Sequence, residues 1–131
     1  MPEGENFSFT GRLRSMRYAV QGMATMLRTQ QNAWIHAAAT VAVIALGIAC
    51  RLSTAEWCAI VLAIVAVWTA EALNTAFEFL TDVVSPAFDP LAGKAKDVAA
   101  GAVLIAALGA IVIGLLVFGP HLYERFFRAA G

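Results

Sequence analysis

The chain has 131 residues, of which 60% are hydrophobic and only 14% are charged, and its formal net charge is zero. Its mean hydropathy of +0.74 is far above that of soluble domains, so the composition indicates an integral membrane protein. The charge is balanced and there is no basic patch with interleaved aromatic residues, which argues against a nucleic-acid-binding protein.

The first 31 residues carry a pattern that the rest of the chain lacks. Residues 1–8 begin with a polar, acidic stretch, and we expect them to be disordered. Over residues 9–31, basic and apolar side chains recur at helical spacing, which predicts an amphipathic helix lying in the membrane interface. The residues expected to face lipid are Leu13, Met16, Tyr18, Val20, Met23 and Leu27, and those expected to face water or headgroups are Arg12, Arg14, Arg17 and Arg28.

Three apolar stretches follow, at residues 33–50, 55–80 and 98–118. A helix needs about 20 residues to cross a hydrocarbon core, so the sequence predicts one all-α membrane domain with three transmembrane helices. The first connection is so short that the first two helices form an antiparallel hairpin, with Ser53 or Thr54 as the cap of the second helix. Cys50 and Cys58 flank this turn, where free thiols are favoured over a disulfide.

The second connection, residues 82–97, is longer and holds most of the polar side chains outside the N-terminal segment. Pro86 and Pro90 are expected to end one helix and allow a turn, and Asp97 to cap the third helix or to hold a neighbouring lysine. Residues 121–131 are predicted to form a C-terminal tail with a second interfacial segment. Six Lys and Arg residues lie on the side of the N-terminus and this connection, against three on the other side, which predicts a cytoplasmic N-terminus.

The second predicted span ends in the segment EALNTAFEFLTD, residues 71–82. At about 100° per residue, Glu71, Asn74, Glu78 and Asp82 fall on one helix face, with Glu71 deepest in the membrane. A charged residue at the centre of a bilayer costs about 2.5–3.5 kcal/mol on insertion scales, so it usually serves a function inside a bundle or a water-filled cleft. The alternative is a polar contact in which Glu71 and Asn74 hydrogen-bond a neighbouring helix, the role that we also favour for His36.

Carboxylate and amide oxygens with nearby cations form an environment that suits Mg²⁺ and phosphate oxygens, so metal-bridged phosphoryl transfer is the favoured chemistry. The sequence has neither a Cys/His cluster typical of zinc nor a glycine-rich phosphate-binding loop. Bound ATP would therefore be held by a metal and by scattered cations such as Lys94 and Lys96. The alternative role of these lysines is a positively charged membrane anchor.

The segment EALNTAFEFLTD is similar to the pattern E-x-x-N-[ST]-A-x-E-x-x-x-D of the small prokaryotic lipid kinases, the family that includes diacylglycerol kinase and undecaprenol kinase. Residues 91–104, LAGKAKDVAAGAVL, resemble a second pattern of that family, and Asn32-x-x-x-His36 echoes an earlier one. The resemblance covers residues 9–118. It implies ATP-dependent phosphorylation of a membrane lipid hydroxyl by a homotrimer in the bacterial inner membrane, with active sites shared between subunits.

The resemblance also implies roles for single residues. Glu71 would be the general base that accepts the proton of the lipid hydroxyl, and Glu78 would bind the Mg²⁺ that bridges the phosphates of ATP. Asn74 would orient the acceptor or the metal shell. The residues that would contact the nucleotide or neighbouring cations are Glu78, Asp82, Lys96, Asp97, Tyr18 and Arg14.

One position departs from the family pattern. Where the family commonly has a second metal-binding Glu, eight residues after the glycine at position 22, this chain has Gln30. An amide oxygen ligates Mg²⁺ weakly and adds no charge, so impaired catalysis, altered metal dependence and tolerated variation all stay open, and tolerated variation is favoured. Two other functions also stay open: a catalytically weakened scaffold, and a small ion or proton conductor whose pore the polar face would line.

Overall fold

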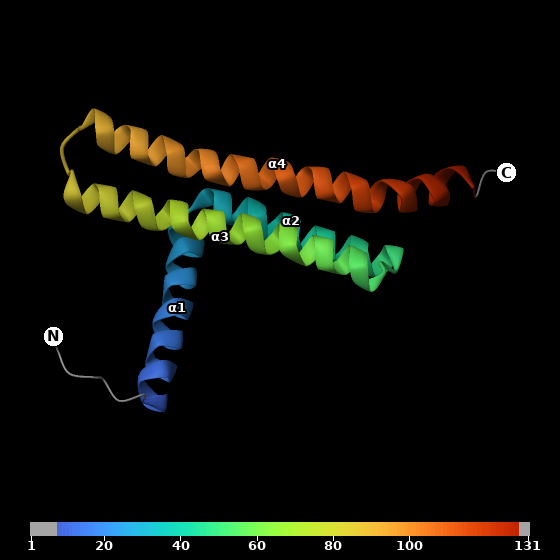
Figure 1. The fold of residues 1–131 in the computed structure, drawn as a ribbon, viewed down its shortest axis with the longest axis horizontal. Coiled ribbons are helices and arrows are strands. Elements are labelled where there is room, and N and C mark those ends of the chain that lie inside the picture. Colours follow the sequence, from blue (N-terminus) through green and yellow to red (C-terminus); the bar gives the residue numbers. More distant parts are fainter. Residues whose placement is uncertain (1–7, 129–131) are drawn as a thin grey trace.

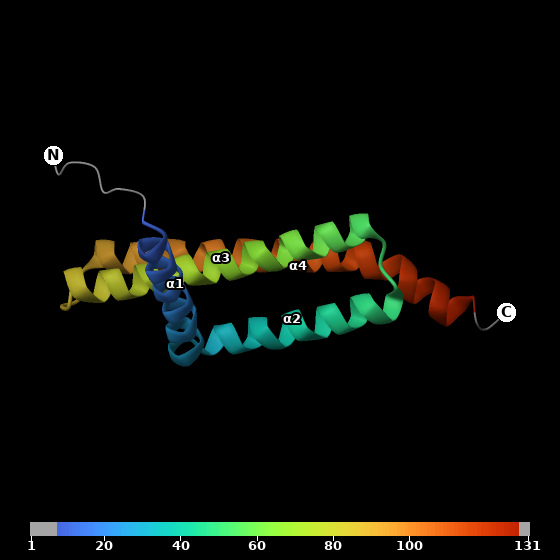
Figure 2. The same cartoon turned by 90° about the horizontal axis from the view of Figure 1, so that it is seen from below.

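The computed structural model describes residues 8–128 as four helices: α1 (Phe9–Thr29), α2 (Gln31–Cys50), α3 (Thr54–Val84) and α4 (Pro90–Phe127). Helices α2, α3 and α4 run alongside one another, and α1 leaves them at a steep angle from the start of α2 (Figures 1 and 2). The last three helices are each long and apolar enough to cross a membrane. The predicted all-α membrane fold is therefore confirmed.

Helix α1 begins at a capping residue and ends at a sharp change of direction. The Ser8 Oγ atom accepts a hydrogen bond from the backbone N–H of Gly11 at 3.4 Å, and Gln30 has an extended backbone that turns the chain into α2. Most of α1 is exposed, and Met26 is its buried residue, as expected for a helix at a membrane surface. The predicted helix at residues 9–31 is thus close to α1, whereas the predicted disordered segment lies outside the described residues apart from Ser8.

Helices α2 and α3 form the predicted hairpin. Arg51 adopts a left-handed backbone conformation at the turn, with φ 55° and ψ 52°. Ser53 caps α3 reciprocally with Glu56, whose Oε2 atom accepts from the Ser53 backbone N–H at 2.7 Å. Both Cys50 and Cys58 are free thiols.

The connection between α3 and α4 is much shorter than predicted. Helix α3 continues to Val84 and α4 begins at Pro90, so the loop comprises residues 85–89 instead of 82–97. The cap of α4 is Asp89, whose Oδ1 atom accepts two backbone N–H groups of the first turn at 2.7 and 3.0 Å. Pro90 fits the first helical position because no helical partner exists there for its missing N–H. The prediction that the third helix starts near residue 98 with Asp97 as its cap is therefore wrong.

Helices α3 and α4 are longer than the spans that hydropathy predicted. Their 31 and 38 residues make rods of about 46 and 57 Å, whereas a hydrocarbon core is about 30 Å thick. The end of α3 and the start of α4 extend beyond the point where α1 meets the bundle (Figure 1). At its other end α4 continues through Pro120 to Phe127, so the predicted tail at residues 121–131 is helical as far as Phe127.

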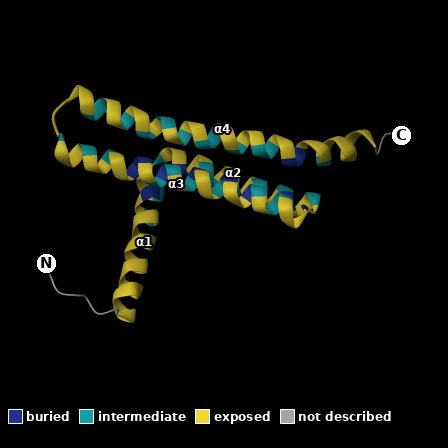
Figure 3. Ribbon diagram, viewed as in Figure 1, coloured by how far each residue is buried: buried dark blue, intermediate teal, exposed yellow. Residues whose placement is uncertain are grey.

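The apolar core lies at the hairpin end of the bundle. Leu52, Ile60, Val117 and Phe118 form a buried cluster that joins the hairpin turn and α3 to α4. Most other large apolar side chains are exposed (Figure 3), as expected where lipid or further copies of the chain cover the helices. A second buried region lies where α1, α2 and α3 meet (Figure 3), and three of the buried residues of α3 are polar.

Candidate functional site

Three polar side chains of α3 are buried: Glu71 is 0% exposed, Thr75 4% and Asn74 5%. Thr75 is satisfied, because its Oγ1 atom donates to the backbone carbonyl of Glu71 at 2.9 Å. Both carboxylate oxygens of Glu71 and the Oδ1 atom of Asn74 are buried without a hydrogen-bond partner among the described residues. An unsatisfied buried acceptor costs about 1–3 kcal/mol, so these atoms indicate a place where a donor arrives from outside the chain.

Glu71 and Asn74 line a cleft of about 240 Å³ between α2, α3 and α4. Asn32 and His36 line it from α2, and α4 contributes apolar side chains such as Val103. The Nε2 atom of His36 lies 3.7 Å from Oε2 of Glu71, so the expected polar contact of His36 is with the buried carboxylate. Asn32 was not predicted to line the site. Its four-residue spacing from His36, which puts both on one helix face, is the signal that could have identified it.

A second cavity, of about 360 Å³, adjoins this cleft, because both are lined by Ile35, His36 and Ala107. Its lining is almost wholly apolar and extends between α2, α3 and α4 as far as Ile60 and Gly114. The cleft that contains these unpartnered oxygens, and four polar side chains in all, therefore continues into an apolar groove.

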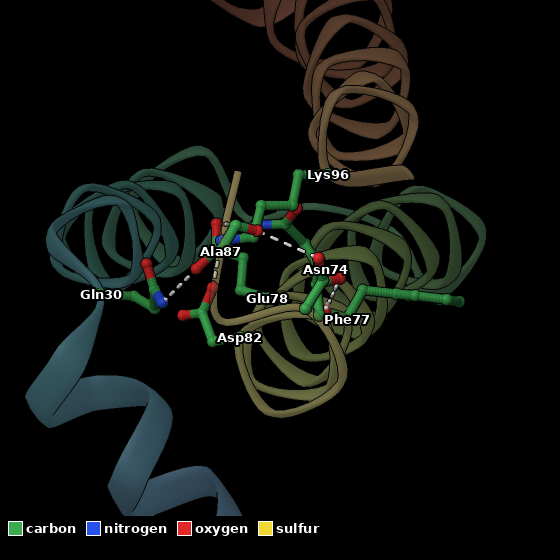
Figure 4. Close-up of polar contacts among 9 residues, drawn as sticks. Gln30, Asn74, Phe77, Glu78, Asp82, Ala87 and Lys96 are labelled. Atoms are coloured by element: carbon green, nitrogen blue, oxygen red, sulfur yellow. Dashed lines mark hydrogen bonds and ion pairs between the residues drawn. The ribbon is translucent and has the colours of Figure 1, made fainter. Parts of the chain in front are cut away.

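The carboxylate of Glu78 accepts hydrogen bonds from two side-chain amides (Figure 4). Gln30 Nε2, at the junction of α1 and α2, donates to Oε2 at 2.7 Å, and Asn74 Nδ2 donates to Oε1 at 3.3 Å. Because an ionised carboxylate only accepts hydrogen bonds, both amides must turn their NH₂ groups toward it. Gln30 is thus a hydrogen-bond donor to Glu78, and its role as a metal ligand stays a prediction.

The remaining predicted site residues are more exposed. Asp82 forms an ion pair with Lys96, which joins the end of α3 to the start of α4. Asp97 is exposed on α4, and Tyr18 and Arg14 are exposed on α1. A single chain therefore gathers Gln30 with the polar residues of α3 but leaves four predicted nucleotide contacts, Asp82 among them, on its surface.

The donor set limits how a metal ion could bind. Within residues 8–128, no group of three or more His, Cys, Asp or Glu side chains could hold a metal ion. Glu78 offers hard oxygen donors, whereas Mg²⁺ requires an octahedral shell and usually keeps waters or takes phosphate oxygens. A single carboxylate fits a cation that has most of its ligands from water or a bound phosphate.

The buried face of α3 is polar over only part of its length. Toward the start of the helix its buried residues are Ile60, Ala63 and Val67. A conducting pore needs suitable lining across the whole membrane. The geometry of the single chain therefore favours a site at one end of the bundle over a pore.

Known proteins resemble this chain over the region that contains the candidate site. A model of the prokaryotic diacylglycerol kinase family matches residues 17–118, a range that includes every predicted site residue except Arg14. An undecaprenol kinase from Bacillus subtilis is 42% identical over 109 residues, which cover 83% of this chain and 89% of that protein. A diacylglycerol kinase from Synechocystis is 39% identical over 111 residues, covering 84% and 63% of the two chains. One from Escherichia coli is 28% identical over 120 residues, covering 86% and 93%.

Proposed function

Because this chain belongs to the prokaryotic diacylglycerol kinase family, and is therefore a lipid kinase with ATP as co-substrate, we propose that it phosphorylates a lipid hydroxyl at the cytoplasmic surface of the bacterial inner membrane. The observation that carries this proposal is the carboxylate of Glu71, which is fully buried and has no hydrogen-bond partner among residues 8–128, in a cleft with four polar side chains that adjoins an apolar groove. A membrane lipid has a polar reacting group and an apolar remainder, and the two adjoining cavities suit these two parts.

Glu71 is the general base in this proposal. The lipid hydroxyl donates to one of its unpartnered oxygens and passes its proton to the carboxylate as the hydroxyl oxygen bonds to the γ-phosphorus. The bond between that phosphorus and the β–γ bridging oxygen breaks, and ADP leaves. General base catalysis contributes about 10²–10⁴-fold to a rate. Asn74 would orient the acceptor or the metal shell, and its unpartnered Oδ1 atom would accept from a donor other than the hydroxyl proton that Glu71 takes.

Glu78 would bind Mg²⁺ together with phosphate oxygens of ATP, and the cation would neutralise charge on the transferring phosphoryl group. We also propose Asp82, Lys96, Asp97, Tyr18 and Arg14 as nucleotide contacts. Their exposure fits this role, because ATP approaches from water while the lipid approaches from the bilayer.

The proposed orientation places the N-terminus in the cytoplasm. Helix α1 would lie along the inner surface of the membrane, and the ends of α3 and α4 that extend beyond it would reach into the cytoplasm. Support comes from the excess of Lys and Arg on this side of the chain, six against three.

A homotrimer is the proposed assembly, with sites completed by neighbouring subunits. Exposed nucleotide contacts on α1 support it, since Tyr18 and Arg14 are available to a second copy. Large apolar side chains are also exposed along α2 and α4. Native mass spectrometry of the protein released from detergent micelles should give three times the mass of the single chain, and a monomer would contradict the proposal.

The relatives are named for two lipid alcohols, diacylglycerol and undecaprenol, and both are candidate substrates here. Purified protein in lipid vesicles would be incubated with [γ-³²P]ATP and MgCl₂, with either alcohol or with a bacterial lipid extract. Labelled lipids would then be separated by thin-layer chromatography. We expect one labelled lipid, whose identity names the substrate.

Glu71→Gln should lower the labelling by about 10²-fold or more, because the general base is lost. The variant should still elute at the same volume as the wild type in size-exclusion chromatography, as a folded protein of the same size would. The matched control is Glu56→Gln, which makes the same change at the opposite end of α3 and should keep activity. If the wild type labels no lipid from any of these sources, the proposed function is wrong.

A further inference from the structure

Gln30 joins three helices at the site. Its backbone N–H donates to the carbonyl of Met26 at 2.9 Å at the end of α1, and its side chain reaches Glu78 on α3. Met26 and Ala33, on either side of it in the chain, are 2% and 0% exposed. The Gln30 amide is therefore anchored between two buried positions and directed at a single carboxylate.

Each oxygen of Glu78 accepts one amide hydrogen, from Gln30 and from Asn74. These donors stabilise the ionised carboxylate by charge-assisted hydrogen bonds. A second carboxylate in place of the Gln30 amide would repel Glu78 unless a cation lay between the two. With glutamine at this position, Glu78 is held without any cation.

The hydrogen bond competes with metal ligation by Gln30. To ligate a cation, the amide must turn its Oε1 atom toward the ion and give up the 2.7 Å bond from Nε2 to Glu78. Asn74 also turns its Nδ2 atom toward Glu78, so of these three residues Glu78 is the one that offers oxygen donors to a cation. A single carboxylate is a poor site for a free divalent cation, because Mg²⁺ binding of this kind relies on substrate phosphates for further ligands.

We propose that Gln30 is a positioning residue that holds Glu78 in place without a metal ion, so that the site receives a single divalent cation together with ATP. The inference rests on the proposed function, because it takes Glu78 as a group that binds the cation of the Mg²⁺–ATP complex. It predicts that the nucleotide-free protein binds divalent cations poorly and that the reaction requires no free cation beyond the one on ATP.

Cation binding can be measured without turnover. Mn²⁺ would be titrated into the nucleotide-free protein in vesicles, and free Mn²⁺ would be followed by electron paramagnetic resonance. The wild type and Gln30→Ala should bind Mn²⁺ weakly, and Gln30→Glu should bind it at least about tenfold more tightly because two carboxylates then share the ion. The matched control is Gln31→Glu, which adds the same charge at the next, exposed position and should bind like the wild type.

Kinetics test the positioning role. At a fixed concentration of Mg²⁺–ATP, the wild-type rate should not change with free Mg²⁺, whereas the rate of Gln30→Glu should rise with it. Gln30→Ala should raise KM for Mg²⁺–ATP about tenfold with a smaller change in kcat, because Glu78 loses one of its two donors. Gln31→Ala should leave both constants unchanged.

Three results would overturn the inference: tight Mn²⁺ binding by the nucleotide-free wild type, equal Mn²⁺ affinity of Gln30→Glu and wild type, or an unchanged KM for Gln30→Ala. Each leaves the proposed function intact as long as the wild type phosphorylates a lipid. The proposed function fails on a different observation, the absence of any labelled lipid.

Discussion

His36 on α2 and Glu71 on α3 face each other across the cleft, with 3.7 Å between Nε2 and Oε2. The distance is too long for a hydrogen bond, yet the His36 imidazole is close enough to interact electrostatically with a carboxylate whose side chain is only 1% exposed. Because the Glu71 oxygens accept no hydrogen bond within the described part of the chain, a protonated His36 at this distance would stabilise their negative charge. A carboxylate must be ionised to accept a proton as a general base. His36 would therefore affect the catalytic rate through the charge of Glu71.

The first prediction concerns this pair. His36→Leu removes the imidazole and keeps an apolar side chain, and we expect kcat to fall about tenfold, equivalent to about 1.4 kcal/mol in activation free energy. KM for ATP should stay unchanged, because His36 lies in the cleft proposed for the lipid. His36→Gln keeps an N–H donor and should recover part of the loss. Steady-state phosphorylation assays would check both variants, and wild-type kcat in His36→Leu would exclude this role.

The second prediction concerns the ion pair between Asp82 and Lys96. Variants of this pair can show whether Lys96 mainly joins α3 to α4 or mainly binds the nucleotide. Both side chains are partly exposed, and exposed ion pairs contribute only about 0–1 kcal/mol, so Lys96→Ala should barely change the thermal unfolding midpoint. If Lys96 contacts phosphate, the same variant should raise KM for ATP about tenfold, which is about 1.4 kcal/mol of binding free energy.

The charge-swapped double variant Asp82→Lys with Lys96→Asp provides the decisive comparison. It restores an ion pair between α3 and α4 with the charges exchanged, so it should keep the wild-type stability but leave KM for ATP high. A wild-type KM in the double variant would mean that Lys96 serves only to join the two helices. Arg28→Ala, at an exposed position near the end of α1, is the control for a general loss of positive charge.

The third prediction concerns the interface beside the apolar groove. Trp68 Nε1 donates to Thr40 Oγ1 at 3.0 Å across α2 and α3, and Thr40 in turn donates to the backbone carbonyl of His36 at 2.7 Å. Side-chain hydrogen bonds between membrane helices contribute about 0.6 kcal/mol on average and up to about 1.7 kcal/mol. Trp68→Phe should destabilise the protein by an amount in this range.

A double-mutant cycle with Thr40→Val isolates the hydrogen bond from other effects of the two substitutions. The second substitution should cost less once the first has been made, with a coupling free energy of about 0.6 kcal/mol or more. Unfolding in mixed detergent micelles would be followed by far-ultraviolet circular dichroism, because this signal reports helix content and not the substituted tryptophan. It would provide the unfolding free energies of the wild type, the two single variants and the double variant. Strictly additive effects would mean that the contact contributes nothing to stability.

The polar face of α3 could be predicted because it depends on helix geometry alone. Glu71, Asn74 and Glu78 lie three or four residues apart, so any helix there puts them on one face, and their position within an apolar span indicated burial. What surrounds them could not be predicted in the same way. The contact of Gln30 with Glu78 joins residues 48 positions apart, and whether an amide offers its nitrogen or its oxygen depends on that distant partner.

Helix ends outside the membrane were predicted least well. Polar residues near Lys94 and Lys96 looked like a loop because hydropathy detects only the part of a helix that lies in lipid. A helix that emerges into water becomes polar without ending, and α4 does so at both ends. The local signal for its true start was present, since Asp89 followed by Pro90 is a typical cap and first helical residue.

The last prediction concerns the close packing at the hairpin end. A Cβ atom added to Gly47 on α2 would lie 2.7 Å from the ring of Trp57 on α3 and 3.2 Å from Leu52 Cδ1. Trp57 is partly buried and packs against the buried core cluster, so a shift of its ring would disturb that contact. Gly47→Ala should therefore destabilise the protein by about 1–3 kcal/mol, the usual cost of overpacking a core.

The control is Gly109→Ala on α4, because a Cβ atom there meets nothing within 4 Å. Alanine favours a helix over glycine by about 1 kcal/mol, so this variant should be as stable as the wild type or more stable. The double variant Gly47→Ala with Trp57→Leu should recover part of the loss, since the smaller side chain relieves the contact. Equal unfolding midpoints for Gly47→Ala and Gly109→Ala would mean that α2 and α3 have room to separate at this point, and that the close approach of Trp57 is not required for the fold.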